Sequence, residues 1–385
     1  MEKITEFCTG CRTCEKICPK EAITMVYDNE GFLIPKINND KCINCTLCVK
    51  KCPQEKEIEN QGVQLVYAGV LKEKEILIKS TSGGAFMAFA LMIINLKGIV
   101  YGCAFTDDFE VEHIRVDNLH DLKKLQGSKY VQSNTKNTFN QVENDLKSGK
   151  FVLYSGTPCQ IAGLYSFLGK DYTNLCTIDL VCHGVPSPMM FKKYIEWKED
   201  SLGGKITSYS FRYKENGYGG RYLVRVEGNK RVKKFPIMLD PYGDAFLAGK
   251  TFRESCYKCK YANINRIADI TIGDFWGIEN VKTNIDIKSG VSLIIVNSEQ
   301  GKKIFDLAKD RLNYYKMDLK TAKEHNECLN HPVSRPDVRT QVYNGFKEEE
   351  YFRSKLKVGL KIKLRLSSLI PVRLKESLKQ FKKRG

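Results

Sequence analysis

Cysteine residues dominate the chemistry that this sequence can perform, because eight of them fall into two runs with identical spacing. In each run, gaps of two, two and three residues separate four cysteines, and a proline follows the last one. The runs extend from Cys8 to Pro19 and from Cys42 to Pro53. A cubane cluster of four irons needs four converging thiolates, and two-residue gaps let one tight loop present three of them. The repeat therefore predicts two 4Fe-4S clusters near the N-terminus.

The last cysteine of each run is expected to serve the other cluster, as in two-cluster bacterial ferredoxins. The predicted ligand sets are Cys8, Cys11, Cys14 and Cys52 for one cluster and Cys42, Cys45, Cys48 and Cys18 for the other. Structural zinc is the alternative for Cys-x2-Cys pairs. A zinc site needs only four ligands and gives no reason for a repeated run that ends in proline, so the spacing favours iron–sulfur clusters.

Four further cysteines lie in contexts that suit a metal site. Cys159 and Cys182 each follow a predicted strand in a loop with Gly and Pro, and Cys256 and Cys259 form a Cys-x2-Cys pair. Glycine lets backbone approach a bulky cluster, and strand ends in α/β domains are where ligands bind. A lone cysteine is often only a small buried hydrophobe, so both interpretations stay open on spacing alone. Core packing is the better interpretation for Cys103 and Cys176, which lie in apolar strands, and Cys328 lacks a comparable context.

Composition places these cysteines in a reducing compartment. The chain begins Met1-Glu2-Lys3-Ile4-Thr5, without the apolar core of a signal peptide. Its longest apolar run, Ala85 to Ile94, is too short to span a bilayer. Fifteen cysteines in such a chain favour metal ligands in the cytoplasm over a secreted disulfide scaffold.

The order of elements indicates more than one domain, since 385 residues exceed what one core usually holds. Beyond a polar linker at 54–62, apolar strands alternate with helices, which is typical of an α/β domain. Strands are expected at 99–105, 151–154, 175–181, 268–273 and 292–296, and helices at 85–96, 160–168, 189–199 and 300–312. Period-two alternation within 206–235 predicts a small antiparallel hairpin insertion around 216–220.

Five motifs of this α/β region together resemble one protein family. They are Ser82-Gly-Gly-Ala-Phe86, Gly127-Ser-Lys-Tyr-Val-Gln-Ser133, Ser155-Gly-Thr-Pro-Cys-Gln160, Cys182-His-Gly-Val-Pro-Ser-Pro188 and Ala268-Asp-Ile-Thr-Ile-Gly-Asp-Phe-Trp276. The set resembles the coenzyme F420 hydrogenase/dehydrogenase beta-subunit family, which also includes a plant chlorophyll-cycle reductase, over about residues 65–335. The resemblance implies an FAD-binding α/β domain and a further 4Fe-4S cluster beside the flavin, on Cys159, Cys182, Cys256 and Cys259. It also implies hydride exchange between flavin and substrate and single-electron exchange with the clusters.

The resemblance points to residues that would hold the flavin. Ser82, Gly83 and Gly84 precede a predicted helix, where free N–H groups and the helix dipole suit a pyrophosphate, although an ordinary serine N-cap is the alternative. Lys129 and Gln132 are expected at the polar edge of the flavin, with plain surface residues as the alternative. Asp274 would orient a substrate or bind the ribityl chain, with a plain turn aspartate as the alternative. His183 is expected to support its neighbour Cys182 or the fold.

Basic residues accumulate at the C-terminus. From residue 353 to 385 there are twelve Lys or Arg and one acid, a net charge of +11 out of +17 for the chain. Interspersed Leu and Ile suit an amphipathic segment that lies on an anionic membrane or docks an acidic partner, and a solvated tail is the alternative. Nucleic-acid binding is not favoured, because the tail lacks interleaved aromatics.

The sequence thus predicts an α+β ferredoxin-like domain at 1–60, an α/β flavin-binding domain with a small antiparallel insertion at 65–345, and a basic amphipathic tail at 346–385. The expected function is a cytoplasmic iron–sulfur flavoprotein oxidoreductase. It would link coenzyme F420 or another hydride carrier to one-electron carriers. The alternative is a non-catalytic subunit that connects a partner enzyme to ferredoxin. Expected partners are ferredoxin or a hydrogenase or dehydrogenase subunit, with peripheral contact to the inner membrane surface through the tail.

Overall fold

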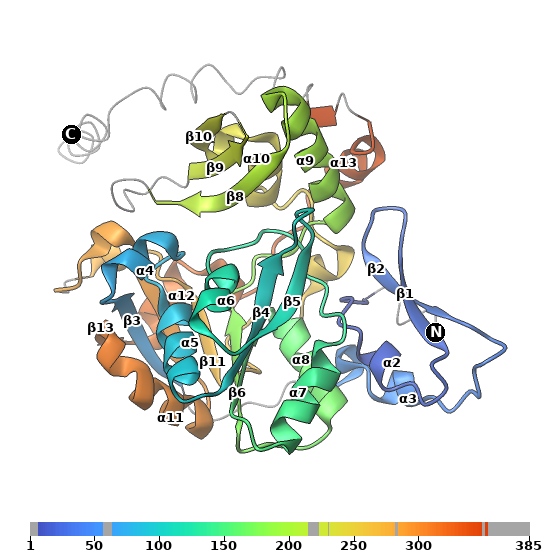
Figure 1. The fold of residues 1–385 in the computed structure, drawn as a ribbon, viewed down its shortest axis with the longest axis horizontal. Helices are drawn as coiled ribbons and strands as arrows, with labels where there is room; N and C mark the ends of the chain where they lie inside the picture. Colours follow the sequence, from blue (N-terminus) through green and yellow to red (C-terminus); the bar gives the residue numbers. More distant parts are fainter. Residues whose placement is uncertain are drawn as a thin grey trace.

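The computed structural model describes residues 7–56, 64–214, 223–229, 231–281, 284–348 and 351–352. A small N-terminal domain lies at the side of a larger α/β domain, and a second, smaller sheet lies across one end of that domain (Figure 1). The predicted fold class, a ferredoxin-like domain followed by an α/β domain with a small antiparallel sheet, is confirmed.

The N-terminal domain is a hairpin with two short helices. Strands β1 (Ile23–Tyr27) and β2 (Leu33–Ile37) pair antiparallel, and α2 (Thr13–Lys16) and α3 (Leu47–Lys50) begin inside the cysteine runs. The two runs share their backbone shape: Gly10 and Arg12 in the first, and Asn44 and Thr46 in the second, all have φ between 54° and 69°. Left-handed φ is uncommon outside glycine, so both cysteine loops are wound in the same specific way.

The α/β domain is built on an eight-stranded mixed sheet of order β13-β3-β12-β11-β7-β6-β4-β5. Its central strands β11, β7, β6 and β4 run parallel, and the other strands pair antiparallel with their neighbours. The strands are β3 (Leu65–Leu71), β4 (Ile99–Phe105), β5 (Val111–Val116), β6 (Val152–Gly156), β7 (Leu175–Leu180), β11 (Ile270–Asp274), β12 (Ser292–Val296) and β13 (Leu312–Met317).

Helices cover both faces of this sheet. On β4, Val100 belongs to the core beneath α5 and α11, whereas Tyr101 belongs to the core beneath α7 and α8, as strand alternation requires. The helices are α4 (Lys74–Lys79), α5 (Ala85–Asn95), α6 (Leu119–Leu122), α7 (Thr138–Lys147), α8 (Pro158–Leu168), α11 (Glu299–Ala308) and α12 (Leu319–Glu324). The 3-10 turns are η1 (Pro53–Glu55), η2 (Lys123–Leu125), η3 (Ile237–Leu239), η4 (Glu254–Lys258), η5 (Ile278–Asn280), η6 (Ile287–Ser289), η7 (Lys309–Arg311) and η8 (Glu327–Leu329).

The predicted hairpin insertion has a third strand. Its sheet consists of β8 (Ile206–Tyr213), β9 (Leu223–Gly228) and β10 (Val232–Pro236), and its predicted turn at 216–220 lies outside the described residues. The sheet shares an aromatic core with α9 (Pro188–Leu202), α10 (Pro241–Leu247) and α13 (Arg339–Gly345). Phe346 and Phe352 are buried in this core, so packed chain continues beyond residue 345.

One sequence expectation changes in the α/β domain, and others fall on segments outside the described residues. The helix expected over 300–312 ends at Ala308, because a 3-10 turn intervenes and Leu312 begins the edge strand β13. Most of the predicted linker and residues 353–385 of the tail lie outside the described residues, so membrane docking stays a prediction. Within the described ranges, no helix is both long and apolar enough to cross a membrane.

Candidate redox site at the carboxyl edge of the sheet

A large cavity lies at the edge of the sheet where the four parallel strands end. Its volume is about 540 Å³, within the range of cofactor pockets. Five of the six predicted flavin residues line it, namely Ser82, Gly84, Lys129, Gln132 and Asp274. Gly83 does not line it and instead packs against β3, where an added Cβ would lie 2.1 Å from the carbonyl oxygen of Gly69. The close packing of Gly83 against the sheet is what holds this loop in place.

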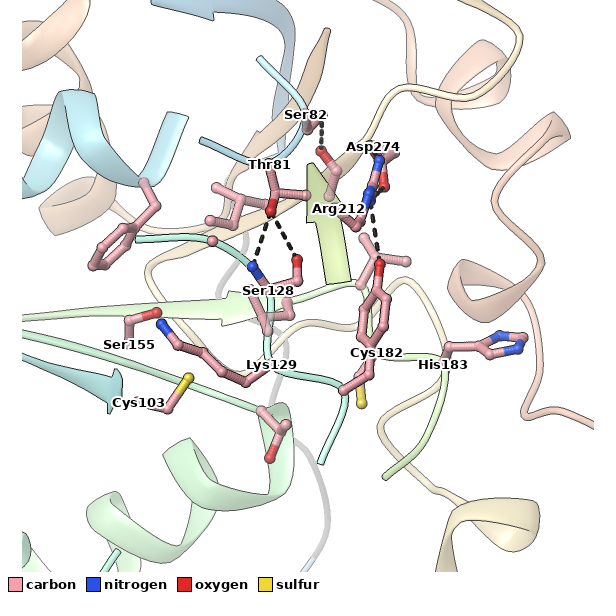
Figure 2. Close-up of a pocket in the computed structure, with 18 of the residues that line it drawn as sticks. Thr81, Ser82, Cys103, Ser128, Lys129, Ser155, Cys182, His183, Arg212 and Asp274 are labelled. Atoms are coloured by element: carbon pink, nitrogen blue, oxygen red, sulfur yellow. Dashed lines mark hydrogen bonds and ion pairs between the residues drawn. The ribbon is translucent and has the colours of Figure 1, made fainter. Parts of the chain in front are cut away.

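The Ser80–Gly84 loop has a backbone conformation that lets it line the cavity closely. Ser82 and Gly84 have φ of 53° and 76°, and α5 starts directly after them. Ser82 Oγ donates to the carbonyl of Val291 at 2.7 Å, so this hydroxyl anchors the loop and does not act as an N-cap. Thr81 Oγ1 accepts hydrogen bonds from the Ser128 amide and hydroxyl at 2.9 and 3.0 Å (Figure 2). The two predicted flavin-binding segments are thereby fastened to each other at the cavity wall.

The Lys129 side chain projects into this cavity toward Ser155 and Cys103 (Figure 2). Its ammonium donates to the carbonyls of Lys124 and Gln126 at 2.9 and 3.1 Å. Burial lowers the pKa of Lys129 below its ordinary value, and the nearby Cys103 thiol opposes that change. The structure therefore places the Lys129 ammonium at the cavity wall, where an anionic or electron-rich group would be stabilised.

Gln132 and Asp274 have protein partners that the sequence did not reveal. Gln132 Nε2 donates to the carbonyl of Thr9 at 2.7 Å, so this side chain contacts the N-terminal domain. Asp274 forms a two-bond ion pair with Arg212 of β8, at 2.6 and 2.9 Å (Figure 2). Arg212 thus joins the small sheet to the end of β11 across the cavity. The sequence did not suggest Arg212, because it lies far from Asp274 in the chain and no local pattern marks it.

The second predicted group of cysteines is brought together beside the large cavity. Cys159, Cys182, Cys256 and Cys259, here called the central set, surround a smaller cavity of about 40 Å³. Cys159 and Cys182 also line the large cavity, so the two spaces share a wall. Burial raises the pKa of all four thiols, and their mutual charge repulsion raises that of Cys159, Cys182 and Cys256 further. Such thiols need a cationic centre before they ionise together.

The first N-terminal group, here called the inner set, consists of Cys8, Cys11, Cys14 and Cys52. Burial raises the pKa of Cys14, and the neighbouring Cys11, Cys8 and Cys52 raise it further. Burial also raises the pKa of Cys52 to about 11, with Cys11 and Cys8 among its charged neighbours. Cys52 comes from the second run, so the structure places one cysteine of that run beside three of the first, as an exchange of the fourth cysteine would require.

The second N-terminal group, here called the outer set, lines a cavity of about 30 Å³; it consists of Cys18, Cys42, Cys45 and Cys48. Cys45 is exposed, and burial raises the pKa of Cys48, with Cys45 and Cys18 adding to the rise. Cys18 comes from the first run, which completes the exchange. Ile43, which follows Cys42 in the chain, is 58% exposed, so the outer set opens toward solvent.

The arrangement of the thiols bears on the choice between zinc and iron clusters. Throughout the described ranges, no three His, Cys, Asp or Glu side chains converge closely enough to hold a single metal ion. The central and outer thiols instead border a space, as expected when a multi-atom cluster stands between the ligands.

The inner set is packed against the α/β domain at helix α8. A Cβ added to Gly163 would lie 2.8 Å from Cys11 Cβ and 3.2 Å from its Sγ, so only glycine permits this approach. Thr13 Oγ1 donates to the carbonyl of Gly163 at 2.9 Å. Cys159 lies four residues before Gly163 on the same helix, a rise of about 6 Å. One helical turn therefore separates the central set from the inner set.

Tyr261 also connects the two groups. Its ring is buried, its hydroxyl donates to the carbonyl of Pro53 at 3.3 Å, and its charged neighbours include Cys159, Cys11, Cys259 and Cys52. Further contacts hold the domains together: Arg12 Nε donates to Asn134 Oδ1 at 2.7 Å, and Lys260 Nζ donates to the carbonyl of Pro53 at 2.6 Å. The N-terminal domain is thus docked by many polar contacts around its inner set.

The remaining cysteines and histidines divide between core and cavity. Cys176 is fully buried in β7, as expected for a packing residue. Cys103 and Cys328 line the large cavity, which the sequence did not suggest. His183 points away from Lys129 and Ser155 in Figure 2, and its Nδ1 lies 3.7 Å from Cys328 Sγ. Burial lowers the pKa of a second histidine of the wall, His113, to about 4, so this side chain is neutral at pH 7.

Comparison with known proteins agrees with this division into two parts. Residues 149–321 match the model of the C-terminal region of the coenzyme F420 hydrogenase/dehydrogenase beta subunit, and residues 7–56 match the 4Fe-4S dicluster domain. The first match includes the central set and Asp274, and it begins after Ser82–Gly84, Lys129 and Gln132. No curated protein sequence matches this chain.

Among solved structures, a chain of the F420-reducing NiFe hydrogenase complex from Methanosarcina barkeri, studied by xenon derivatization, aligns with 78% of this chain and 90% of its own length. The sequence identity is 16% and the TM-score is 0.44. The chain thus contains one segment similar to a 4Fe-4S dicluster domain and a second segment similar to the C-terminal region of the coenzyme F420 hydrogenase/dehydrogenase beta subunit.

Proposed function

We propose that this chain is an iron–sulfur flavoprotein oxidoreductase with FAD in the large cavity and a third 4Fe-4S cluster on the central set. It passes electrons between a two-electron substrate, coenzyme F420 or another hydride carrier, and one-electron carriers. The observation that supports this most strongly is continuity: the large cavity shares Cys159 and Cys182 with the central space, and α8 leads from Cys159 to Cys11.

The cavity offers suitable groups for a flavin dinucleotide. The Ser80–Gly84 loop and the N-terminus of α5 supply backbone N–H groups and a positive helix end for a pyrophosphate. Lys129 would face the electron-rich edge of the ring, and Asp274 with Arg212 closes the opposite wall. When bound, a flavin takes up a hydride as an electron pair and releases electrons one at a time. A one-electron acceptor must then lie close to it, which is the role assigned to the central set.

The three cysteine groups would then act in a fixed order. Clusters held by the central, inner and outer sets would lie in that order from the large cavity, with one turn of α8 between the first two, and would carry electrons one at a time. The exposed Cys45 marks the point where a one-electron carrier docks. Since the matched family is described as a beta subunit, we propose a hydrogenase or dehydrogenase subunit or a ferredoxin as that partner in the cytoplasm. The size of the large cavity favours this enzyme over a subunit that only conducts electrons.

The test begins with anaerobic purification of the full chain and analysis of its flavin, iron and sulfide. Three cubanes require about twelve irons per chain. Cys256→Ser should lower this by about four and should stop electron transfer from reduced flavin to an external carrier, while flavin reduction by substrate survives. Cys176→Ala is the matched control, because this buried thiol lies in β7 outside the site. Full iron and full transfer in Cys256→Ser would make these cysteines packing residues. Comparing reduced F420 with NADH as donors identifies the substrate.

A further inference from the structure

Arg253 is a buried arginine whose hydrogen bonds all go to neutral groups. Only 5% of the residue is exposed. Its Nε donates to the carbonyl of Cys8, Nη2 donates to the carbonyl of Leu33 at 3.0 Å, and Nη1 donates to Gln132 Oε1 at 3.2 Å. In the part of the chain that the structure describes, no carboxylate pairs with this guanidinium.

The other buried cations of the described chain are compensated in ways that Arg253 is not. Arg266 pairs with Asp179 at 2.9 Å, and Arg339 pairs with Glu30 at 2.6 Å. Lys214 also lacks a carboxylate partner at hydrogen-bond distance, but burial lowers its pKa to about 7, so it can shed its charge. A guanidinium remains protonated in proteins, and an isolated buried charge is costly. Arg253 therefore requires a negative charge nearby.

The position of Arg253 indicates where that negative charge lies. Its side chain binds the carbonyl of Cys8, a member of the inner set, and its own carbonyl accepts from the Cys256 amide at 2.8 Å. The ring of Phe32 lies 5.3 Å from its guanidinium carbon. The cation is thus enclosed by protein where the inner and central cysteine sets meet.

A 4Fe-4S cluster with four thiolate ligands has a net negative charge, and each reduction adds one more. A fixed cation nearby stabilises the reduced form, in a low-dielectric interior more than in water. We propose that Arg253 is the counter-charge shared by the inner and central clusters and holds both of their reduction potentials up. This inference rests on the proposed cluster ligands. Arg253 then makes both clusters better acceptors of electrons leaving the large cavity, and it acts without touching the substrate.

The test measures reduction potentials in the full-length, cluster-loaded protein by potentiometric titration with EPR detection. Arg253→Gln removes the charge and should shift the two potentials assigned to the inner and central clusters to more negative values. The outer cluster should stay closest to wild type and serves as an internal reference. Arg253→Lys keeps the charge and should restore potentials near wild type. Ser255→Ala removes a neutral donor to the same Cys8 carbonyl, at 3.1 Å, and should change little.

Iron content separates this inference from the proposed function. If wild-type protein holds fewer than about twelve irons, the ligand assignment fails. If iron is complete but Arg253→Gln has wild-type potentials, the counter-charge role is wrong. If Arg253→Lys shifts as far as Arg253→Gln, hydrogen bonding rather than charge sets the potentials, and the proposal is again overturned. Arg253→Met supplies the neutral comparison should the glutamine variant lose iron.

Discussion

The inner and outer cysteine sets repeat one another in sequence and in backbone, yet their surroundings differ. Gly10 and Arg12 of one loop match Asn44 and Thr46 of the other in left-handed conformation. The inner set packs against Gly163 of α8, and its member Cys52 is buried. The outer set opens to solvent at Cys45. Identical cysteine spacing therefore builds two loops of the same backbone shape, and docking alone places one set against the α/β domain and leaves the other open to solvent.

The largest expected contrast comes from removing one ligand of each set. Cys14→Ser and Cys48→Ser should each lower iron by about four per chain, since each destroys one cubane. Substrate should still reduce the inner and central clusters of Cys48→Ser. In Cys14→Ser the outer cluster should stay oxidised, because its supply is interrupted. Freeze-quench EPR after substrate addition measures this difference. Reduction of the outer cluster in Cys14→Ser as fast as in wild type would show that the order of the relay is wrong.

A smaller effect is expected from adding a side chain at Gly163, where α8 touches the inner set. Gly163→Val places methyl groups where Cys11 lies, at an overpacking cost of about 1–3 kcal/mol. Electron transfer from the central to the inner set should slow, with iron content maintained. Gly204→Ala is the control, since nothing lies within 4 Å of its added Cβ. Stopped-flow absorbance on both variants provides the measurement, and identical rates would refute close contact at this turn.

A third prediction concerns the hairpin of the N-terminal domain. Arg339 is buried and contacts Glu30 of this hairpin and Glu254 just before Cys256, at 2.6 and 2.7 Å. Arg339→Ala should destabilise the docked domain by about 1–3 kcal/mol, because both carboxylates are partly exposed and recover some solvation. Arg335→Ala, which removes an exposed partner of Glu254, should cost at most about 1 kcal/mol. Denaturant unfolding measures the loss of stability in both variants. A larger loss in Arg335→Ala than in Arg339→Ala would show that Arg339 does not contribute most of the docking energy.

The smallest expected effect is a difference in salt sensitivity. Exposed charges are screened by salt far more than buried ones. Raising ionic strength should therefore shift the reduction potential of the outer cluster more than that of the inner cluster. Titrations at low and high salt measure both shifts in one sample. Equal shifts would mean that the inner set is as accessible to solvent as Cys45.

Much of the fold was predictable because its signals are local. The strands at 99–105 and 292–296 match β4 and β12, and the buried helix starting at Ala85 matches α5. Cys159, Cys182 and Asp274 could be assigned to one edge of the sheet, because each lies at or just after the end of a predicted strand. The third strand of the small sheet was missed, because its stretch Val232–Pro236 is charged and largely exposed and lacks the alternation of a buried strand.

The sequence by itself determined the two cysteine runs, which predict exchanged fourth ligands, and the glycines of the Ser80–Gly84 loop. These depend on spacing and on backbone conformation within a few residues. Only the tertiary structure decided which cysteine set lies inside, which partner holds Asp274, and which cation contacts the backbone of both the inner and central sets. Arg253 and the Cys8 carbonyl that it binds are 245 residues apart in the chain. No local pattern encodes such a contact, because it arises only when the docked domain excludes water from both groups.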